Sequence, residues 1–319
     1  MTRTRSLASG LVSLSAAAVL ALTAAGGATA APSNSEDKES PIVASVAVES
    51  AGVAAYWTPD RMRNAISGEV LAGKALERSN RASTPIVEKA KTKKTEGNVS
   101  KAINPTSVKH IGKIFFTMGT SNYVCSGNAV ESDNRSTVAT AGHCAVGGPD
   151  QKATNFVFVP AYENGSTPYG TWTAKELYTP TEWSTAGNIS FDTAFAVMNP
   201  NDDGESLTEV VGASKVAFGE ARGLNYTIYG YPADKQFNGL TLKSCAGTAT
   251  NDTTNTKFTT QGIPCDMNGG ASGGPWFIGS GPDGVQNSIN SYGYSGSKVM
   301  FGPYWGPEIE ATYDLAQAS

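Results

Sequence analysis

Gly269-Gly270-Ala271-Ser272-Gly273-Gly274-Pro275 is the stretch that decides the fold, once it is read together with Thr140-Ala141-Gly142-His143-Cys144. A serine framed by glycines is typical of an exposed nucleophile. A hydroxyl is a weak nucleophile at neutral pH, so it needs an adjacent base. The chain contains two histidines, His110 and His143, and both precede Ser272. The order of base and nucleophile along the chain is therefore the first constraint.

The order excludes one interpretation of this serine. Gly270-Ala271-Ser272-Gly273-Gly274 also fits the G-x-S-x-G nucleophile elbow of α/β-hydrolases, in which the histidine follows the serine. No histidine follows Ser272, so that interpretation fails. The remaining alternative is a plain glycine-rich turn. The apolar run 275–278 and the upstream His143 argue against it.

His143 is the better candidate for the base. It follows the apolar run 136–140 and stands beside Cys144, which can fix its loop. His110 precedes the first apolar strand and has no such neighbour. We therefore expect no role for His110.

Asp192 is the candidate for the group that orients this base. It stands at the head of the apolar run 193–198, where a carboxylate is costly to bury unless it is paired. An imidazole is a suitable partner. The alternative is a turn aspartate in the loop after Gly187.

The glycines around Ser272 have a use in the same chemistry. A tetrahedral oxyanion needs backbone N–H donors in a conformation that glycine adopts readily. We expect the N–H groups of Gly270 and Ser272 to form this oxyanion hole.

The N-terminal third of the chain divides into two segments. Residues 1–30 carry Arg3 and Arg5, an apolar stretch and Ala28-Thr29-Ala30, the pattern of a cleaved secretory signal peptide; a one-helix membrane anchor is the alternative. Residues 31–100 are charged and Ala-rich, and we interpret them as a propeptide or linker; a disordered spacer is the alternative. A helix is predicted over 59–77, with Ile66, Val70 and Leu71 on one face.

Residues 101–319 have the pattern of β-structure. Short apolar or alternating runs bounded by turn residues occur throughout, and they predict antiparallel all-β structure. The runs are 111–118, 136–141, 155–160, 193–198, 215–218, 226–231 and 274–278. A short C-terminal helix is predicted over 308–318.

The four cysteines fall into two local pairs, Cys125 with Cys144 and Cys245 with Cys265, among three connectivities that four cysteines allow. Export to an oxidising compartment favours disulfides. A zinc site is the alternative, but no C-x-x-C spacing supports it. We therefore expect no metal.

The charge of the chain excludes one class of partner. Its net charge is −4 and charged residues make up 16% of it, without a basic patch interleaved with aromatics. We expect no nucleic-acid binding. After signal cleavage we also expect no membrane contact.

These motifs resemble the chymotrypsin-like serine proteases. Thr-Ala-Gly-His-Cys, an Asp-x-Ala strand and Gly-x-Ser-Gly-Gly-Pro occur in that family's order, and the resemblance is closest to secreted bacterial members that include glutamyl endopeptidases. It implies two packed six-stranded antiparallel β-barrels, about 105–205 and 206–306. The triad His143, Asp192 and Ser272 would lie between them, and Cys125–Cys144 would match the family's histidine-loop disulfide.

The resemblance continues beyond the nucleophile. Ser291-Tyr292-Gly293 stands where the family binds substrate backbone, and Gly302-Pro303-Tyr304 resembles the strand that walls the specificity pocket. It therefore implies substrate-binding roles for Ser291, Gly293 and Gly302. Asp266, six residues before Ser272, occupies the position of the acid that selects Lys or Arg in trypsin-like enzymes.

Two departures from the family pattern bear on activation and specificity. Animal members have an aspartate immediately before the serine, which binds the N-terminus released by activation, whereas this chain has Ala271. Glutamyl-specific members have a histidine where this chain has Asn290. Activation by an N-terminal ion pair and cleavage after Glu are therefore not expected.

The sequence thus predicts a secreted, bacterial serine endopeptidase. It would be a monomer that forms an acyl-enzyme on Ser272, acts on proteins or peptides, and needs no cofactor. The alternatives are a catalytically silent binding protein on the same fold, or an esterase with the same triad.

Overall fold

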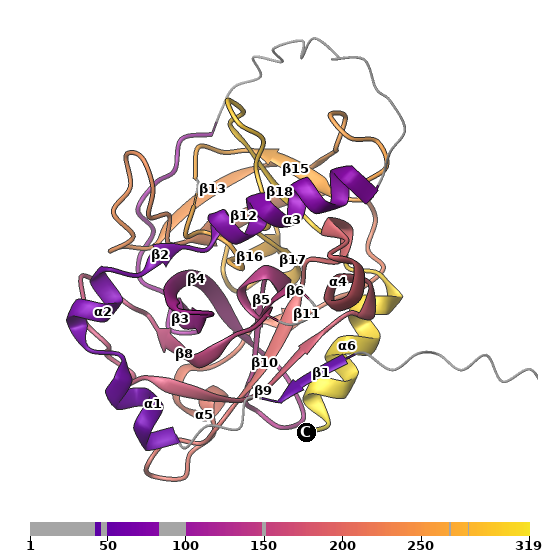
Figure 1. Ribbon diagram of the computed structural model, residues 1–319. Coiled ribbons are helices and arrows are strands. Elements are labelled where there is room, and N and C mark those ends of the chain that lie inside the picture. Colours follow the sequence, from indigo (N-terminus) through magenta and orange to yellow (C-terminus); the bar gives the residue numbers. More distant parts are fainter. Residues whose placement is uncertain (1–41, 46–49, 83–99, 149–150, 268, 280) are drawn as a thin grey trace, which may run out of the picture. The chain divides into compact units, whose positions relative to one another are not determined.

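The apolar runs of the sequence form β-sheets in a computed structural model, and most of their strands pair antiparallel; residues 215–216 pair in parallel (Figure 1). The structure describes residues 42–45, 50–82, 100–148, 151–267, 269–279 and 281–319, which belong to one compact unit, Glu39–Ser319. The predicted signal peptide, 1–30, lies outside the described residues, as do parts of 31–100. Within the described ranges, no helix is both long and apolar enough to cross a membrane.

The first half of the region 101–319 forms a closed six-stranded barrel. The strand order is β9-β10-β5-β4-β3-β8, and pairing between β8 and β9 closes it. The strands are β3 (Ile111–Met118), β4 (Ser121–Val130), β5 (Thr137–Thr140), β8 (Thr154–Pro160), β9 (Trp172–Thr179) and β10 (Ala194–Met198). A short hairpin of β6 (Val146–Gly148) and β7 (Gln151–Lys152) follows the turn that carries His143.

The second half contains two smaller sheets. One has the order β11-β17-β16-β12-β13 and the other β14-β15-β18. Tyr292, which follows the strand β17, forms a bridge to Phe301 of β18. The strands are β11 (Lys215–Val216), β12 (Asn225–Gly230), β13 (Lys243–Thr248), β14 (Thr250–Asn251), β15 (Gln261–Pro264), β16 (Pro275–Ile278), β17 (Val285–Ile289) and β18 (Val299–Gly302).

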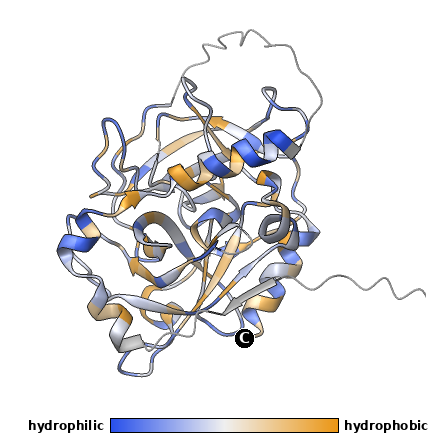
Figure 2. Ribbon diagram, in the orientation of Figure 1, coloured by the Kyte–Doolittle hydropathy of each residue, from blue (hydrophilic) through white to orange (hydrophobic). Residues whose placement is uncertain are grey.

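Strand β3 shows why some of these runs are apolar throughout. Ile114 and Phe116 belong to one buried cluster, whereas Ile111 and Phe115 belong to a second cluster on the other face. A strand buried on both faces has no polar side to show in its sequence. In Figure 2 hydrophobic (orange) segments occur within several strands, beside white and blue ones.

Short helices connect the strands or cover their ends. Those within residues 101–319 are η1 (Gly142–Cys144), α4 (Thr181–Ala186), η2 (Ile189–Phe191), α5 (Leu207–Val211) and α6 (Pro307–Gln317). Helix α6 confirms the C-terminal helix. Its buried Tyr313 packs against Phe195 of β10, with ring centroids 5.4 Å apart.

The single helix predicted over 59–77 is wrong. The chain forms α2 (Pro59–Arg63), then β2 (Ile66–Ser67), then α3 (Glu69–Ala82), because residues 66–67 pair in parallel with β4 at Tyr123 and Val124. Leu71 is buried as expected, but Ile66 and Val70 are 46% and 49% exposed. The other N-terminal elements are β1 (Ile42–Ser45), which pairs with β9, and α1 (Ser50–Tyr56).

Both predicted disulfides are present, Cys125–Cys144 and Cys245–Cys265. Their sulfur atoms also belong to the two clusters of metal-ligating residue types among the described residues. Disulfide sulfurs are not thiolates and cannot serve as zinc ligands in the usual way. In these clusters the sulfurs are therefore cross-links: one disulfide joins β4 to the turn 142–144, and the other joins β13 to the residue after β15.

Candidate active site

His143 and Asp192 form a buried pair in the first barrel. The Nδ1 of His143 lies 2.7 Å from Asp192 Oδ2, and the His143 backbone N–H donates to Asp192 Oδ1, also at 2.7 Å. The side chains are 1% and 0% exposed. A carboxylate at Nδ1 holds the imidazole proton on that nitrogen, so Nε2 keeps the lone pair that a base needs.

Ser291 completes the surroundings of this carboxylate. Its hydroxyl donates to Asp192 Oδ2 at 2.5 Å. Asp192 thus accepts three hydrogen bonds, which offset the cost of burying its charge. The sequence predicted only a substrate-binding role for Ser291. Its hydrogen bond to Asp192 was not predicted.

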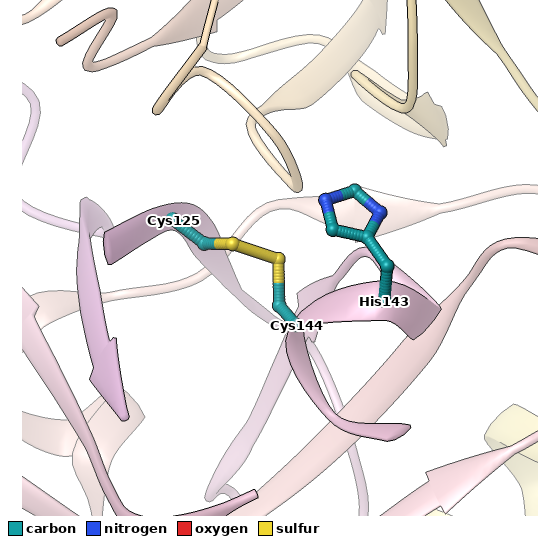
Figure 3. Close-up of side chains that lie close together, drawn as sticks. All are labelled: Cys125, His143 and Cys144. Atoms are coloured by element: carbon teal, nitrogen blue, oxygen red, sulfur yellow. A yellow bond between two sulfur atoms is a disulfide. The ribbon is translucent and has the colours of Figure 1, made fainter. Parts of the chain in front are cut away.

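The turn η1 fixes the position of the imidazole. Its Cys144 is bonded to Cys125 of β4, and Figure 3 shows the His143 ring beside this disulfide. Nε2 is buried and makes no hydrogen bond to any described residue. The second histidine, His110, instead lies 2.7 Å from Asn128 Oδ1.

The Ser272 loop requires glycine at two positions. Gly270 has φ +95°, and a Cβ there would lie 2.7 Å from Tyr231 O; Gly273 has φ +82°, and a Cβ would overlap the Thr140 hydroxyl. L-residues rarely adopt these angles. Neither the Gly270 N–H nor the Ser272 N–H donates to another described residue, so both remain available for an oxyanion.

Ser126 of β4 ties this loop to the first barrel. Its backbone N–H donates to Ser272 O at 2.7 Å, and its hydroxyl donates to Gly270 O at 2.9 Å. The same hydroxyl oxygen accepts from Tyr231 N–H at 2.9 Å. These bonds join residues more than 100 positions apart, and no local pattern in the sequence announces them.

Asn290 ties the loop from the opposite side. It is 0% exposed, and its Nδ2 donates to Ala271 O at 3.0 Å and to Tyr229 O at 2.7 Å. Its Oδ1 accepts from Trp276 Nε1 at 2.8 Å. One bond of this amide therefore holds the carbonyl of the residue that precedes the nucleophile, and the other holds β12 at Tyr229.

Ser291 and Gly293 line the cavity next to Ser272, together with Tyr292 and Met300. Asp266 and Gly302 are not among its lining residues. The Asp266 carboxylate instead accepts from the backbone N–H of Ala102 at 2.7 Å. The structure thus brings two of the four predicted substrate-binding residues to the nucleophile.

The same cavity contains a residue that the sequence did not single out, Glu69. Its carboxylate lies against Gly269, where an added Cβ would be 2.5 Å from Glu69 Oε2. Burial raises the pKa of Glu69, although the nearby Lys235 opposes this shift. The glycine at position 68, inside a helical pattern, was the available sign that the chain breaks here.

Comparisons with known proteins add independent information. No family model and no curated protein matches the chain. Among solved structures, the protease Anisep from Arthrobacter nicotinovorans is 62% identical, with a TM-score of 0.67, and the match covers 68% of this chain and all of that one.

Two further structures are similar. The thermostable serine protease AL20 from an extremophilic microorganism is 50% identical over 66% of this chain and 98% of its own, with a TM-score of 0.64. A Glu endopeptidase solved with MPD has a TM-score of 0.55 and covers 70% of this chain and 99% of that one. At 19% identity, it supports the fold alone.

Proposed function

Because this chain belongs to the chymotrypsin-like serine proteases and is a serine endopeptidase, we propose that His143, Asp192 and Ser272 are its catalytic residues. The observation that carries the proposal is the buried pair in which Asp192 binds His143 at Nδ1. That bond leaves Nε2 as the basic nitrogen. The alternative histidine, His110, is partly buried and is bound to Asn128 instead.

The geometry supports the following sequence of steps. His143 Nε2 removes the proton of Ser272 Oγ, which attacks the scissile carbonyl carbon. The N–H groups of Gly270 and Ser272 bind the resulting oxyanion. The imidazolium, stabilised by Asp192, returns the proton to the leaving amine and an acyl-enzyme remains. Water, deprotonated by His143, then attacks the acyl carbonyl and releases Ser272.

We extend the proposal to substrate binding. Ser291 and Gly293 would bind the substrate backbone, a role favoured by their position in the cavity beside Ser272. Gly302 and Asp266 would contribute to the wall and base of the specificity pocket. Since Asp266 also holds Ala102, cleavage preferences are best read from a peptide library, in which an even spread over all P1 residues would exclude an Asp266-directed pocket.

We also propose that residues 1–30 direct export and that 31–100 are a propeptide of an extracellular monomer. The solved Arthrobacter protease has counterparts to 68% of this chain, and the first barrel strand begins at Ile111. About a third of the chain therefore has no equivalent in that protease.

For the test, residues 31–319 are produced with the recognition sequence of an added cysteine protease in place of residues 89–94. The added protease then makes the cut, so processing does not depend on Ser272. After cleavage and separation of the fragments, Ser272→Ala should abolish labelling by a fluorophosphonate, and casein hydrolysis should fall by about 10⁴-fold or more. Ser184→Ala is the matched control, since that buried hydroxyl bonds only to carbonyls of its own helix region. Retained labelling in Ser272→Ala would refute the assignment.

Peptide amides and simple esters should be compared on the same enzyme. Hydrolysis of esters without hydrolysis of amides would favour the esterase alternative. Absence of both, with intact folding, would favour a silent binding protein.

A further inference from the structure

The segment 66–82 runs through the region of the nucleophile. Residues 66–67, as β2, pair in parallel with β4 at Tyr123 and Val124, and the Gly68 N–H donates to Val124 O at 2.9 Å. The chain then passes the Cys125–Cys144 disulfide, because a Cβ at Gly68 would lie 2.5 Å from Cys125 Sγ. Helix α3 begins at the next residue, Glu69.

Ser67 and Glu69 lie directly against the nucleophile loop. A Cβ at Gly269 would overlap the Ser67 hydroxyl and would lie 2.5 Å from Glu69 Oε2. The cavity that Glu69 shares with Ser272, Ser291 and Gly293 has a volume of about 10 Å³. One water molecule needs roughly this much space, so no substrate side chain can enter.

Helix α3 is fastened to β6, the strand after the His143 turn, and to the segment that precedes Asp192. The Ser79 hydroxyl donates to Gly187 O at 2.7 Å and accepts from Ile189 N–H at 3.0 Å. Arg78 donates to Gly147 O at 2.9 Å. Figure 2 shows hydrophobic and hydrophilic residues interspersed along α3. The buried members, Leu71, Ala72 and Ala75, belong to the same core cluster as Cys144.

The direction of this segment can be compared with that of a substrate. The leaving amine of a substrate must lie on the His143 side of Ser272, because Nε2 returns the proton to it. The acyl part lies along Ser291 and Gly293. A substrate therefore runs, from N to C, from the 291–293 segment toward the disulfide beside His143. The segment 66–69 runs from β4 and the disulfide toward the cavity that Ser291 and Gly293 line.

We propose that Ile66–Ala82 is an inhibitor bound in the active-site cleft in the direction opposite to a substrate. This inference rests on the proposed function of Ser272. In this opposite direction, the nitrogen of each peptide bond lies toward the cavity lined by Ser291 and Gly293, and not toward His143. The leaving amine then has no proton donor, and the segment blocks the cleft without being cut there.

Two glycines of the segment allow a matched test. An added methyl group at Gly68 meets the disulfide and Val124 O, whereas the Cβ of Gly73→Ala has no neighbour within 4 Å. Gly73 lies inside α3, where alanine is the better helix former, whereas Gly68 directly precedes α3. The collision with the disulfide is confined to Gly68→Ala, and Gly73→Ala controls for an added methyl group in the same segment. The full-length 31–319 protein is treated with a fluorophosphonate, and labelling is read on the uncleaved band. Gly68→Ala should label about tenfold faster or more than the parent, in line with the cost of overpacking, and Gly73→Ala no faster.

An equal rate in Gly68→Ala and Gly73→Ala would overturn the inference. A second measurement applies even if Gly68→Ala fails to fold. The parent protein is cut at the 89–94 site and kept concentrated, and its N-terminal fragment is analysed by mass spectrometry. The fragment should stay whole between residues 66 and 70. Products that end at Ser67, Gly68 or Glu69 would show a substrate-like direction.

The two proposals fail in different ways. If the separated protease domain does not label at Ser272, the proposed function is wrong. If it labels, while the full-length band labels equally fast, only the inhibitory role of Ile66–Ala82 is wrong.

Discussion

The amide of Asn290 allows a sharp test of how the nucleophile loop is held. Asn290→Asp preserves the shape of the side chain but removes both donors, so that a carboxylate would face Ala271 O and Tyr229 O in a fully buried site. Such a carboxyl group binds a proton, because burial and neighbouring oxygens disfavour its charge. The protonated form can donate one of the two lost hydrogen bonds.

The expected magnitude follows from what the bond to Ala271 O positions. The Ala271 carbonyl and the Ser272 N–H belong to the same peptide group, so a bond to the carbonyl also orients the N–H. Outright loss of one oxyanion donor lowers kcat by a factor of about 10²–10³. Other contacts to the loop survive, since Ser126 N–H still holds Ser272 O and Gly274 N–H still reaches Ala271 O. We therefore expect kcat to fall by roughly 10- to 100-fold, with KM little changed.

The assay measures kcat and KM on a peptide substrate from pH 5.5 to 9. Each value is expressed as a ratio to that of the parent enzyme, so that any pH dependence common to both enzymes cancels. The ratio for Asn290→Asp should decrease as pH rises, because the donor is lost when the carboxyl group ionises. Asn287→Asp is the matched control: Asn287 is also buried, but its Oδ1 only accepts from Tyr226 OH, at 2.6 Å, a bond that a carboxylate can also make. A ratio near one and flat with pH, together with lowered stability, would refute the positioning role.

Two further predictions concern stability. Burial lowers the pKa of Lys113 to about 7. Between pH 7 and about 10 the unfolded chain therefore holds a proton on this lysine that the folded chain lacks. The free energy of unfolding should accordingly rise with pH over this window, by up to a few kcal/mol. Urea unfolding of the parent and of Lys113→Met checks this, since the variant should lose that slope and parallel curves would contradict it. Cys245→Ala with Cys265→Ala opens a disulfide between residues 20 apart, which should lower the free energy of unfolding by about 3 kcal/mol. An unchanged urea midpoint in the variant would speak against it.

Local sequence patterns predicted much of the fold. The β3 run and the C-terminal helix match within a residue or two, and both cysteine pairs are joined as expected. Short separations explain the disulfides, and dense apolar runs explain the strands. The predicted neighbours His143 and Asp192 are hydrogen-bonded, because a buried carboxylate needs a partner of this kind.

Tertiary contacts decided the parts that could not be predicted. Helical periodicity continues across residues 64–68, but pairing with β4 interrupts it, since packing overrides intrinsic propensity. The roles of Ser126 and Asn290 depend on hydrogen bonds to backbone atoms far away in the sequence. A buried polar residue gives no local indication of which carbonyl it will meet.

The hydrogen bonds of Ser126 and Asn290, together with the inhibitory segment Ile66–Ala82, explain why this chain needs no acid before Ser272. In the protein that still carries Ile66–Ala82, Ser126 and Asn290 already hold Gly270 and Ala271, and Gly270 already has its positive φ. The loop therefore does not need an ion pair from a new N-terminus to adopt this conformation. Because the loop is in place before any cut, control must act on access rather than on assembly. Release of the segment requires β2 to leave β4 and α3 to expose Leu71, Ala72 and Ala75. Activation should accordingly require dissociation of Ile66–Ala82. A cut at 89–94 alone should leave the enzyme inhibited at protein concentrations that keep the N-terminal fragment bound.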